Sequence, residues 1–290
     1  MPVHRSSARG PIVPGEPQPA AQFQAPAEHY DRFMGRYTHS LATALADAAG
    51  IRPGMRVLDV GCGPGGLTRE LATRLGPGNV AAIDPAPQFA AACRDRNPGA
   101  DVRTGVAEQL PWPGAHFDAA LSSLVIGFLH DPGQGVREMA RVTRPGGTVA
   151  ACMWDTTTGG MTMLRIFWTA ARQIAPAAAG ESALAGTADG DIARRLRDAG
   201  LQHVISGALT SHAEYAGFDD FWQPFTLAVG PAGHYLRSLP AGEQAAVRDA
   251  CRRHLPDGPF TLPARAWYAR GLVPAPRGGE HIHDHRNGPA

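Results

Sequence analysis

Residues 55–68 constrain the fold more than any other stretch, because an apolar run changes abruptly into a glycine-rich one: Met-Arg-Val-Leu-Asp-Val-Gly-Cys-Gly-Pro-Gly-Gly-Leu-Thr. The β-branched and apolar residues at 57–60 are typical of a strand covered on both faces. The glycines that follow let the backbone turn sharply and leave room for a flat or extended ligand. A helix after them points its free N–H groups and the positive end of its dipole at that space. The stretch therefore predicts an α/β protein with a ligand site at the turn.

The same glycines fit the pattern Gly-x-Gly-x-x-Gly through Gly61, Gly63 and Gly66, which by itself is weak evidence for a dinucleotide. Asp59 favours a different ligand, because a carboxylate at the mouth of the turn would repel a diphosphate and attract an ammonium group. S-adenosylmethionine has that ammonium group and no phosphate. We therefore expect S-adenosylmethionine here, and an NAD-dependent oxidoreductase is the disfavoured alternative.

Residues 57–65, Val-Leu-Asp-Val-Gly-Cys-Gly-Pro-Gly, resemble motif I of the class I S-adenosylmethionine-dependent methyltransferases. The resemblance is closest to the group that includes the ubiquinone and menaquinone biosynthesis C-methyltransferases, and it is strongest over residues 55–155. It implies a Rossmann-like fold: a seven-stranded, mostly parallel sheet with an antiparallel last strand, helices on both faces and a partly helical lid. It also implies S-adenosylmethionine as cofactor, S-adenosylhomocysteine as product and methyl transfer as the reaction.

Composition narrows the class of protein further. The 290 residues are 43% apolar and 18% charged, which suits one large globular domain with or without a cap. The net charge of +1 gives no electrostatic reason to expect a nucleic acid or an anionic membrane as partner. The four cysteines are scattered and form no Cys-x-x-Cys pair, so we expect no metal and a reducing, cytoplasmic location. A monomer or a homodimer is expected.

The chain divides into a central domain and two tails. Residues 1–26 are rich in proline and predict a disordered tail, and residues 273–290 predict a flexible one in which alternating histidines are a weak metal signal. Residues 27–272 are the expected methyltransferase domain. Three segments are candidates for a lid over the active site: residues 27–50, 156–190 and 211–262.

Asp84 is the expected partner of the cofactor ribose. It ends a predicted second strand about 20 residues past the glycine turn, where an acidic residue can accept hydrogen bonds from both ribose hydroxyls. This spacing serves NAD and S-adenosylmethionine equally. Pro85 and Phe89 follow, and we expect them to lie against the adenine.

Residues 105–112, Gly-Val-Ala-Glu-Gln-Leu-Pro-Trp, resemble the family pattern Gly-Asp-Ala-Glu-x-Leu-Pro-Phe. Val106 replaces the Asp that often accepts the adenine amino group. The resemblance then implies that adenine relies on the Ala107 backbone N–H, with Glu108 as a substitute acceptor. The fourth strand ends at Ser122 and Ser123 beside the glycine turn, where a backbone carbonyl can hold the cofactor ammonium group.

The segment before the glycine turn folds over the cofactor in similar methyltransferases. The resemblance implies that Arg36 meets the cofactor carboxylate. Four side chains would surround the sulfonium: Tyr30, Phe33, Met34 and Tyr37. The alternative is a surface helix whose aromatic side faces the core.

The cofactor carries an activated methyl group, so the protein mainly has to align the acceptor and exclude water, and a strong base is optional. His130 is the leading candidate for a base, since it is the only histidine near the carboxyl end of a motif-bearing strand. A solvent-exposed histidine at a helix entry is the alternative. Trp154 and Asp155, like Tyr30, are placed to touch the acceptor. The near-neutral charge and apolar lid predict a small organic acceptor.

Two other function classes remain open beside methyl transfer. One is an enzyme, such as a decarboxylase or cyclase, that uses bound S-adenosylmethionine without transferring its methyl group. Its product would lack the mass gain of one methyl group. The other is a non-catalytic adenosyl-binding module, which would bind the cofactor and turn over no acceptor.

Overall fold

The computed structural model describes residue 23 and residues 25–275. The two predicted tails lie outside these residues except at positions 23, 25–26 and 273–275, and so do the alternating histidines near the C-terminus. Within the described residues, no helix has the length and apolar character needed to cross a membrane.

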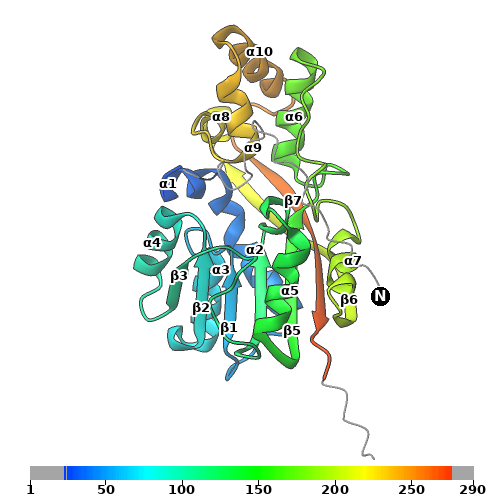
Figure 1. The fold of residues 1–290 in the computed structure, drawn as a ribbon. Coiled ribbons are helices and arrows are strands. Elements are labelled where there is room, and N and C mark those ends of the chain that lie inside the picture. Colours follow the sequence, from blue (N-terminus) through cyan, green and yellow to red (C-terminus); the bar gives the residue numbers. More distant parts are fainter. Residues whose placement is uncertain (1–22, 24, 276–290) are drawn as a thin grey trace, which may run out of the picture.

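A seven-stranded sheet forms the centre of the described part of the chain, in the order β3-β2-β1-β4-β5-β7-β6 (Figure 1). The first five strands pair in parallel, and β7 runs antiparallel to both of its neighbours. This confirms the predicted sheet with its antiparallel last strand. The strands are β1 (Val57–Val60), β2 (Val80–Asp84), β3 (Asp101–Thr104), β4 (Phe117–Ser123), β5 (Thr143–Trp154), β6 (Gln202–Tyr215) and β7 (Phe260–Leu272).

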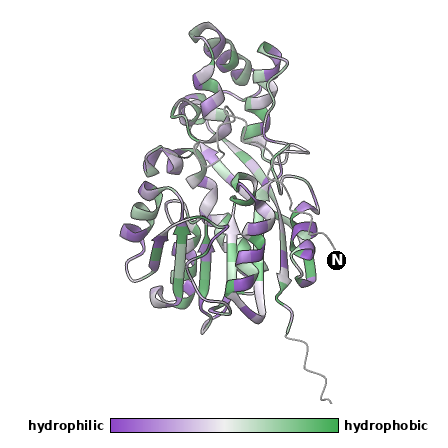
Figure 2. Ribbon diagram, in the orientation of Figure 1, coloured by the Kyte–Doolittle hydropathy of each residue, from purple (hydrophilic) through white to green (hydrophobic). Residues whose placement is uncertain are grey.

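Helices cover both faces because the central strands are apolar on both sides. All residues of β1 and β2 are buried, and successive side chains point to opposite faces. Val57 joins a core with helices α2 and α3, whereas Leu58 joins a second core with α5 and α7. Figure 2 shows the hydrophobic colouring concentrated on these strands. The helices that cover the sheet are α2 (Arg36–Ala48), α3 (Gly66–Leu75), α4 (Pro87–Arg96), α5 (Pro132–Val142) and α7 (Asp191–Asp198).

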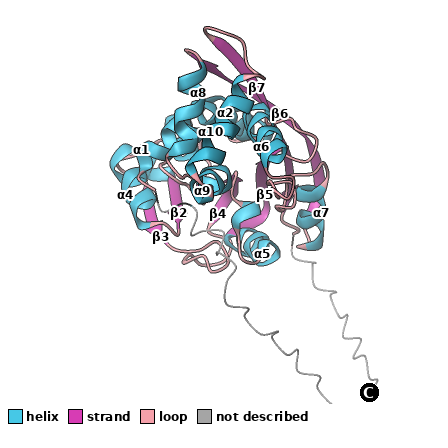
Figure 3. Ribbon diagram, turned by 90° about the horizontal axis from the view of Figure 1, so that it is seen from above, coloured by secondary structure: helices cyan, strands magenta, loops and turns pink. Residues whose placement is uncertain are grey.

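A second group of helices gathers beyond the carboxyl ends of the parallel strands (Figures 1 and 3). It is held together by aromatic packing, in which the rings of Phe167 and Phe225 stack with centroids 4.5 Å apart. Both side chains are fully buried, so they form core rather than a surface. The elements of this end are α1 (Ala27–Tyr30), the π-helix η2 (Asp31–Gly35), α6 (Thr162–Ile174), α8 (Phe218–Thr226), α9 (Gly230–Ser238) and α10 (Ala241–Arg252).

Strands β6 and β7 are longer than the sequence pattern suggested. The sequence predicts a sixth strand near residues 201–209 and a last strand at 265–272, but β6 continues to Tyr215 and β7 begins at Phe260. Residues 209–215 alternate between buried and exposed positions, as the two faces of a half-covered strand require. The extended ends carry the group of helices above the sheet, so part of the 211–262 lid candidate is strand.

Candidate active site

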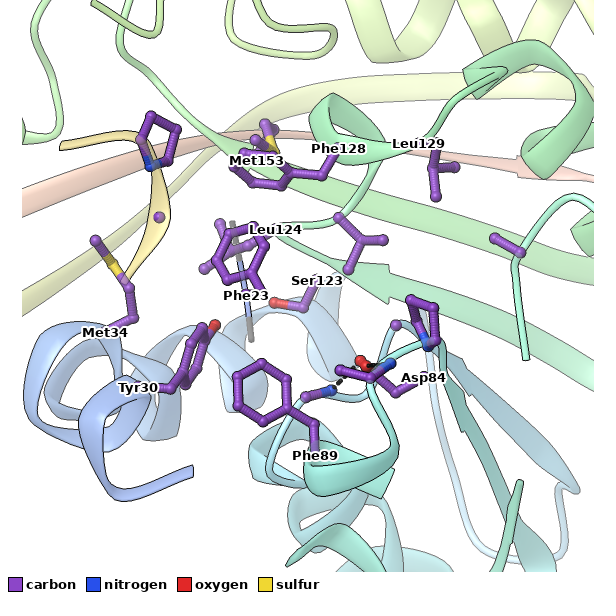
Figure 4. Close-up of a pocket in the computed structure, with 18 of the residues that line it drawn as sticks. Phe23, Tyr30, Met34, Asp84, Phe89, Ser123, Leu124, Phe128, Leu129 and Met153 are labelled. Atoms are coloured by element: carbon purple, nitrogen blue, oxygen red, sulfur yellow. Dashed lines mark hydrogen bonds between the residues drawn. The ribbon is translucent and has the colours of Figure 1, made fainter. Parts of the chain in front are cut away.

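A cavity of about 530 Å³ lies at the carboxyl ends of the parallel strands (Figure 4). Its lining combines the glycine turn after β1, the ends of β2, β4 and β5, the N-terminal helical segment, Glu181 and Thr187. Parallel α/β sheets bind ligands at this edge, where loops diverge to opposite faces. The cavity is therefore the candidate active site.

Two glycines of the turn have different tasks. Gly61 and Gly63 both have positive φ angles, +75° and +52°, which a side chain rarely adopts. A Cβ at Gly61 would lie 2.4 Å from the Val125 side chain, so this glycine allows close packing. A Cβ at Gly63 would meet nothing within 4 Å, and Gly63 lines the cavity. Gly63 thus keeps space open where a ligand can approach the backbone.

Asp84 fixes the turn to the end of β2. One carboxylate oxygen accepts the Gly63 backbone N–H at 2.8 Å, and the other accepts the Ala86 N–H at 2.9 Å. Burial raises the pKa of Asp84 to about 6, although both hydrogen bonds favour the ionised form. Asp84 lines the cavity and each of its oxygens has a further lone pair, so it can accept hydrogen bonds from a ligand.

Aromatic rings from distant parts of the chain form one wall of the cavity (Figure 4). The rings of Tyr30 and Phe89 meet edge-on at 5.6 Å, and those of Phe23 and Phe128 at 4.8 Å. Burial raises the pKa of Tyr30 well above its usual value, so the phenol stays neutral. The sequence indicated Tyr30 and Phe89 at the site but not Phe23 and Phe128, and Phe23 lies in the segment predicted to be a tail.

Several predicted residues lie together on the side of the cavity formed by β2 and β3. Pro85, Ala107 and Glu108 all line it. Glu108 also accepts the backbone N–H groups of His130 and Asp131 at 2.9 and 3.2 Å. The carboxylate therefore ties the loop after β3 to the loop after β4, a structural task that the sequence pattern did not indicate.

The two serines at the end of β4 point differently. Ser123 lines the cavity. Ser122 is 1% exposed, donates a hydrogen bond to the Val60 carbonyl oxygen and does not line the cavity. Adjacent residues of a strand face opposite sides, so only one of the pair could reach the site with its side chain.

The expected place of Asp59 at the mouth of the turn is wrong. Asp59 pairs within the sheet with Ala82 and Leu121, is 1% exposed and is absent from the cavity lining. One oxygen accepts the Thr68 hydroxyl at 2.7 Å, while the other has no hydrogen-bond partner in the described structure. Burial raises the pKa of Asp59 to about 7. The carboxyl group thus lies beneath the turn, with one unsatisfied oxygen.

Arg36 does not lie at the cavity, where a contact with a cofactor carboxylate was expected. Its guanidinium group forms an ion pair with Asp220 at 2.9 Å, donates to the Glu214 carbonyl oxygen and stacks 4.4 Å from the centre of the Tyr215 ring. Arg36 does not line the cavity. These partners are about 180 residues away in the sequence, so its task is to fasten α2 to β6 and α8.

We predict that Arg36→Met lowers the melting temperature by about 2–6 °C, since a partly exposed ion pair and a cation–π contact are each worth about 1 kcal/mol. The affinity for S-adenosylhomocysteine, measured by isothermal titration calorimetry, should change less than about threefold. Asp220→Asn is the matched variant, because it weakens the same pair from the other side. A tenfold loss of affinity in Arg36→Met alone would restore the cofactor role.

The candidate acceptor contacts are only partly brought together. His130 and Trp154 line the cavity, and His130 is exposed. Asp155 does not line it, because its carboxylate is bound by Arg265 and Thr158. The expectation that Asp155 touches the acceptor is therefore wrong: it secures the start of the segment that follows β5.

Glu181 is a lining residue that the sequence pattern did not indicate. It lies between α6 and α7, within residues 176–186, where the content of alanine, glycine and proline predicts a loop. The sequence gives one indication of this role: Glu181 is a single acidic residue in a stretch of otherwise small and apolar residues. Among the described residues, no group of three or more His, Cys, Asp or Glu could hold a metal ion.

Comparisons with known proteins match the central part of the chain, which carries the glycine turn. A family model described as a methyltransferase domain matches residues 58–151. A malonyl-[acyl-carrier protein] O-methyltransferase from Serratia marcescens is 36% identical over 134 residues, which cover 43% of this chain and 51% of that protein. A ubiquinone/menaquinone biosynthesis C-methyltransferase from Bordetella parapertussis is 35% identical over 137 residues, 44% of this chain and 53% of that protein. The matched region thus spans about half the length of these curated relatives.

Solved structures extend the likeness to most of the chain. An S-adenosylmethionine-dependent methyltransferase from Thermotoga maritima has a TM-score of 0.51 at 17% identity, covering 85% of this chain and 95% of that one. The YcgJ protein from Bacillus subtilis has a TM-score of 0.54 at 14% identity, with coverages of 81% and 98%. At these identities the likeness shows the fold. Residues 58–151 therefore match a methyltransferase-domain model, and the chain around them has the fold of these solved structures, a seven-stranded, mostly parallel sheet with helices on both faces.

Proposed function

We propose that this protein transfers the methyl group of S-adenosylmethionine to a small organic acceptor. The observation that carries the proposal is one cavity with two different ends. At one end Gly63 and Asp84 offer open backbone and a hydrogen-bonding carboxylate. At the other end the lining is largely apolar and is completed by the segment after β5. The relatives reported above carry the names of methyltransferases, and one of them is named for quinone biosynthesis, which supports the proposal.

The residues present fit S-adenosylmethionine better than a dinucleotide. Asp84 would accept the ribose hydroxyls, and Phe89, Pro85 and Ala107 would enclose the adenine. When the Asp59 carboxyl beneath the turn is ionised, its unsatisfied oxygen favours a cationic ligand and repels a diphosphate. When bound, this cofactor supplies an activated methyl group. The protein's part is then to align the acceptor and exclude water, which suits the aromatic wall of Tyr30 and its neighbours.

The size of the cavity supports a small acceptor, since about 530 Å³ lies within the range of pockets for small ligands.

His130 lines the cavity and stays a candidate base. We also propose that three segments form the lid: residues 27–50, 156–190 and 211–262. We propose a cytoplasmic location, no nucleic acid or membrane partner, and a monomeric or homodimeric state. Size-exclusion chromatography with light scattering measures the last of these.

The proposed function is tested in two steps on the full-length protein. Calorimetric titration should show binding of S-adenosylhomocysteine and none of NAD. Mass spectrometry of a panel of phenols, hydroquinones and amines, incubated with S-adenosylmethionine, should then show a gain of one methyl group. Binding of NAD instead would refute the assignment. Turnover without that mass gain would favour an enzyme that uses the cofactor without methyl transfer, and binding without any turnover would favour a non-catalytic module.

A further inference from the structure

Glu181 is held in a fixed position at the edge of the cavity. The Thr156 hydroxyl donates a hydrogen bond to the Glu181 carbonyl oxygen at 3.1 Å, which joins this segment to the end of β5. The Leu184 backbone N–H donates to the same oxygen at 3.2 Å. The residue is 7% exposed and lines the cavity. The side chain is thus buried on a backbone that is tied to the sheet.

The carboxylate of Glu181 has few partners for a buried charge. One oxygen accepts the Trp168 indole N–H at 3.1 Å. No other hydrogen bond and no ion pair reaches the carboxylate from the described part of the chain. Burial raises the pKa of Glu181 to about 7. Since a carboxylate can accept about four hydrogen bonds, a ligand in the cavity can donate the hydrogen bonds that the protein does not provide.

Glu181 lies on the side of the cavity opposite the nucleoside end. Asp84 and Gly63 mark that end at β2 and β1, whereas Glu181 and Thr156 belong to the segment after β5. The strand order β2-β1-β4-β5 puts β4 between the two sides. A group that accepts the methyl has to approach from the side that the cofactor leaves free, which is the side of Glu181.

The charges that line the cavity have one sign. The lining carboxylates are Asp84, Glu108 and Glu181, and among the described residues no Lys or Arg lines it. Arg165 and Arg172 instead line an adjoining cavity of about 290 Å³ that shares Thr156, Leu164 and Glu181. Neither arginine forms an ion pair in the described structure. Inside the larger cavity, an acceptor with its own carboxylate would therefore meet like charge among largely apolar side chains.

We propose that Glu181 recognises the acceptor by accepting a hydrogen bond from its hydroxyl or amine group. The acceptor is accordingly a largely apolar molecule with such a donor, and not a carboxylic acid. This inference rests on the proposed function and names its acceptor class.

The same contact can move the acceptor proton. Glu181 accepts the proton of the hydroxyl while the acceptor oxygen uses a lone pair to bond the methyl carbon. The bond from that carbon to sulfur breaks, and its electron pair stays on sulfur. The positive charge of the sulfonium and the negative charge of Glu181 are both lost, which leaves the methyl ether, S-adenosylhomocysteine and a neutral carboxyl group. Glu181 then returns the proton to water. A carboxyl group that titrates near neutral pH suits this task.

The test uses three probes with one aromatic body and different charge: 2-naphthol, naphthalen-2-ylmethylammonium and 2-naphthoate. Their affinities are measured by calorimetry on the full-length protein saturated with S-adenosylhomocysteine. The naphthol and the ammonium probe should bind at least about tenfold more tightly than the naphthoate, since a hydrogen bond to a charged group supplies that much. Glu181→Gln keeps the size of the side chain and an oxygen for the Trp168 indole. This substitution should weaken the binding of the ammonium probe at least tenfold and reduce the difference in affinity between that probe and the naphthoate.

The pH dependence of naphthol binding separates Glu181 from the other titratable groups of the cavity, His130, Asp84 and Glu108. Because the ionised carboxylate is the better acceptor, naphthol affinity should fall as the pH drops through about 7. The His130→Ala variant should show the same loss of naphthol affinity as the pH drops. The Glu181→Gln variant should not show it. Glu243→Gln, on the exposed first turn of α10, is the matched control and should behave like the unmodified protein.

Each outcome bears on the inference separately from the proposed function. If the unmodified protein fails to bind S-adenosylhomocysteine, both are refuted. If it binds S-adenosylhomocysteine but binds the three probes equally, prefers naphthoate or binds none of them, only the role of Glu181 is refuted. The three-probe comparison on the unmodified protein holds even if Glu181→Gln folds poorly.

Discussion

Asp84→Ala is expected to weaken the binding of S-adenosylhomocysteine by about 100-fold or more. The substitution removes the proposed ribose acceptor, and hydrogen bonds to a charged group contribute about 1.5–3 kcal/mol each. Two such bonds correspond to at least about 3 kcal/mol, or roughly 150-fold in affinity. It also frees the Gly63 and Ala86 N–H groups that now hold the turn and the end of β2 in place. Isothermal titration calorimetry on the full-length protein measures the loss.

Two further variants separate this effect from loss of the fold. Asp84→Asn keeps one oxygen and the size of the side chain, so its affinity should lie between those of the unmodified protein and Asp84→Ala. Asp249→Ala removes an exposed carboxylate from α10 and should leave binding unchanged. Thermal unfolding shows whether each variant folds. If Asp84→Ala folds and its affinity stays within threefold, Asp84 does not bind the ribose.

The parts of the site that were predictable from sequence are those that local patterns encode. The apolar run of β1, the glycine turn and the start of α3 lie within fourteen consecutive residues, so strand, turn and helix signals support one another. The spacing from the turn to Asp84 follows from the length of one helix and one strand. Because β1 and β2 are neighbours in the sheet, Asp84 also reaches the Gly63 N–H at 2.8 Å, a contact that the pattern did not indicate.

The parts that were not predictable depend on contacts between distant segments. Arg36 follows an aromatic stretch that looked like a cofactor cover, but its partner Asp220 lies 184 residues away. Asp59 has the right residue type beside the turn, yet its position in β1 directs the side chain beneath α3, where Thr68 binds it. Glu181 showed no periodic pattern. Its burial depends on Trp168 and Thr156, which only the folded chain brings to it.

The same long-range contacts attach the N-terminal helical segment to the far edge of the sheet. The hydroxyl groups of Tyr37 and Tyr215 lie 2.9 Å apart, and those of Ser40 and Ser211 lie 2.7 Å apart. Tyr30 lies about two helical turns before this anchored stretch and contributes to the wall of the cavity. The aromatic cover over the proposed cofactor site is therefore positioned by β6, a strand that does not itself line the cavity.

Gly63→Ala is the second substitution with a large expected effect, because it adds one methyl group where the cavity meets the backbone. The new Cβ would stand in the open space beside Gly63, which the proposed cofactor needs. The φ of +52° also strains an alanine by about 1–2 kcal/mol. We expect the affinity for S-adenosylhomocysteine to fall at least about 30-fold, since steric exclusion adds to any local strain. Calorimetric titration is again the measurement.

Gly54→Ala provides a control that isolates the added methyl group from the strain. Gly54 precedes β1 and has a φ of +89°, and a Cβ at this position, as at Gly63, would meet no atom within 4 Å. Both variants should therefore lose a similar amount of thermal stability, because an alanine is strained at either position. Only Gly63→Ala should lose affinity, because Gly54 is absent from the cavity lining. Equal affinities in the two variants would show that the space beside Gly63 does not receive the cofactor, and the nucleoside end of the cavity would have to be placed elsewhere.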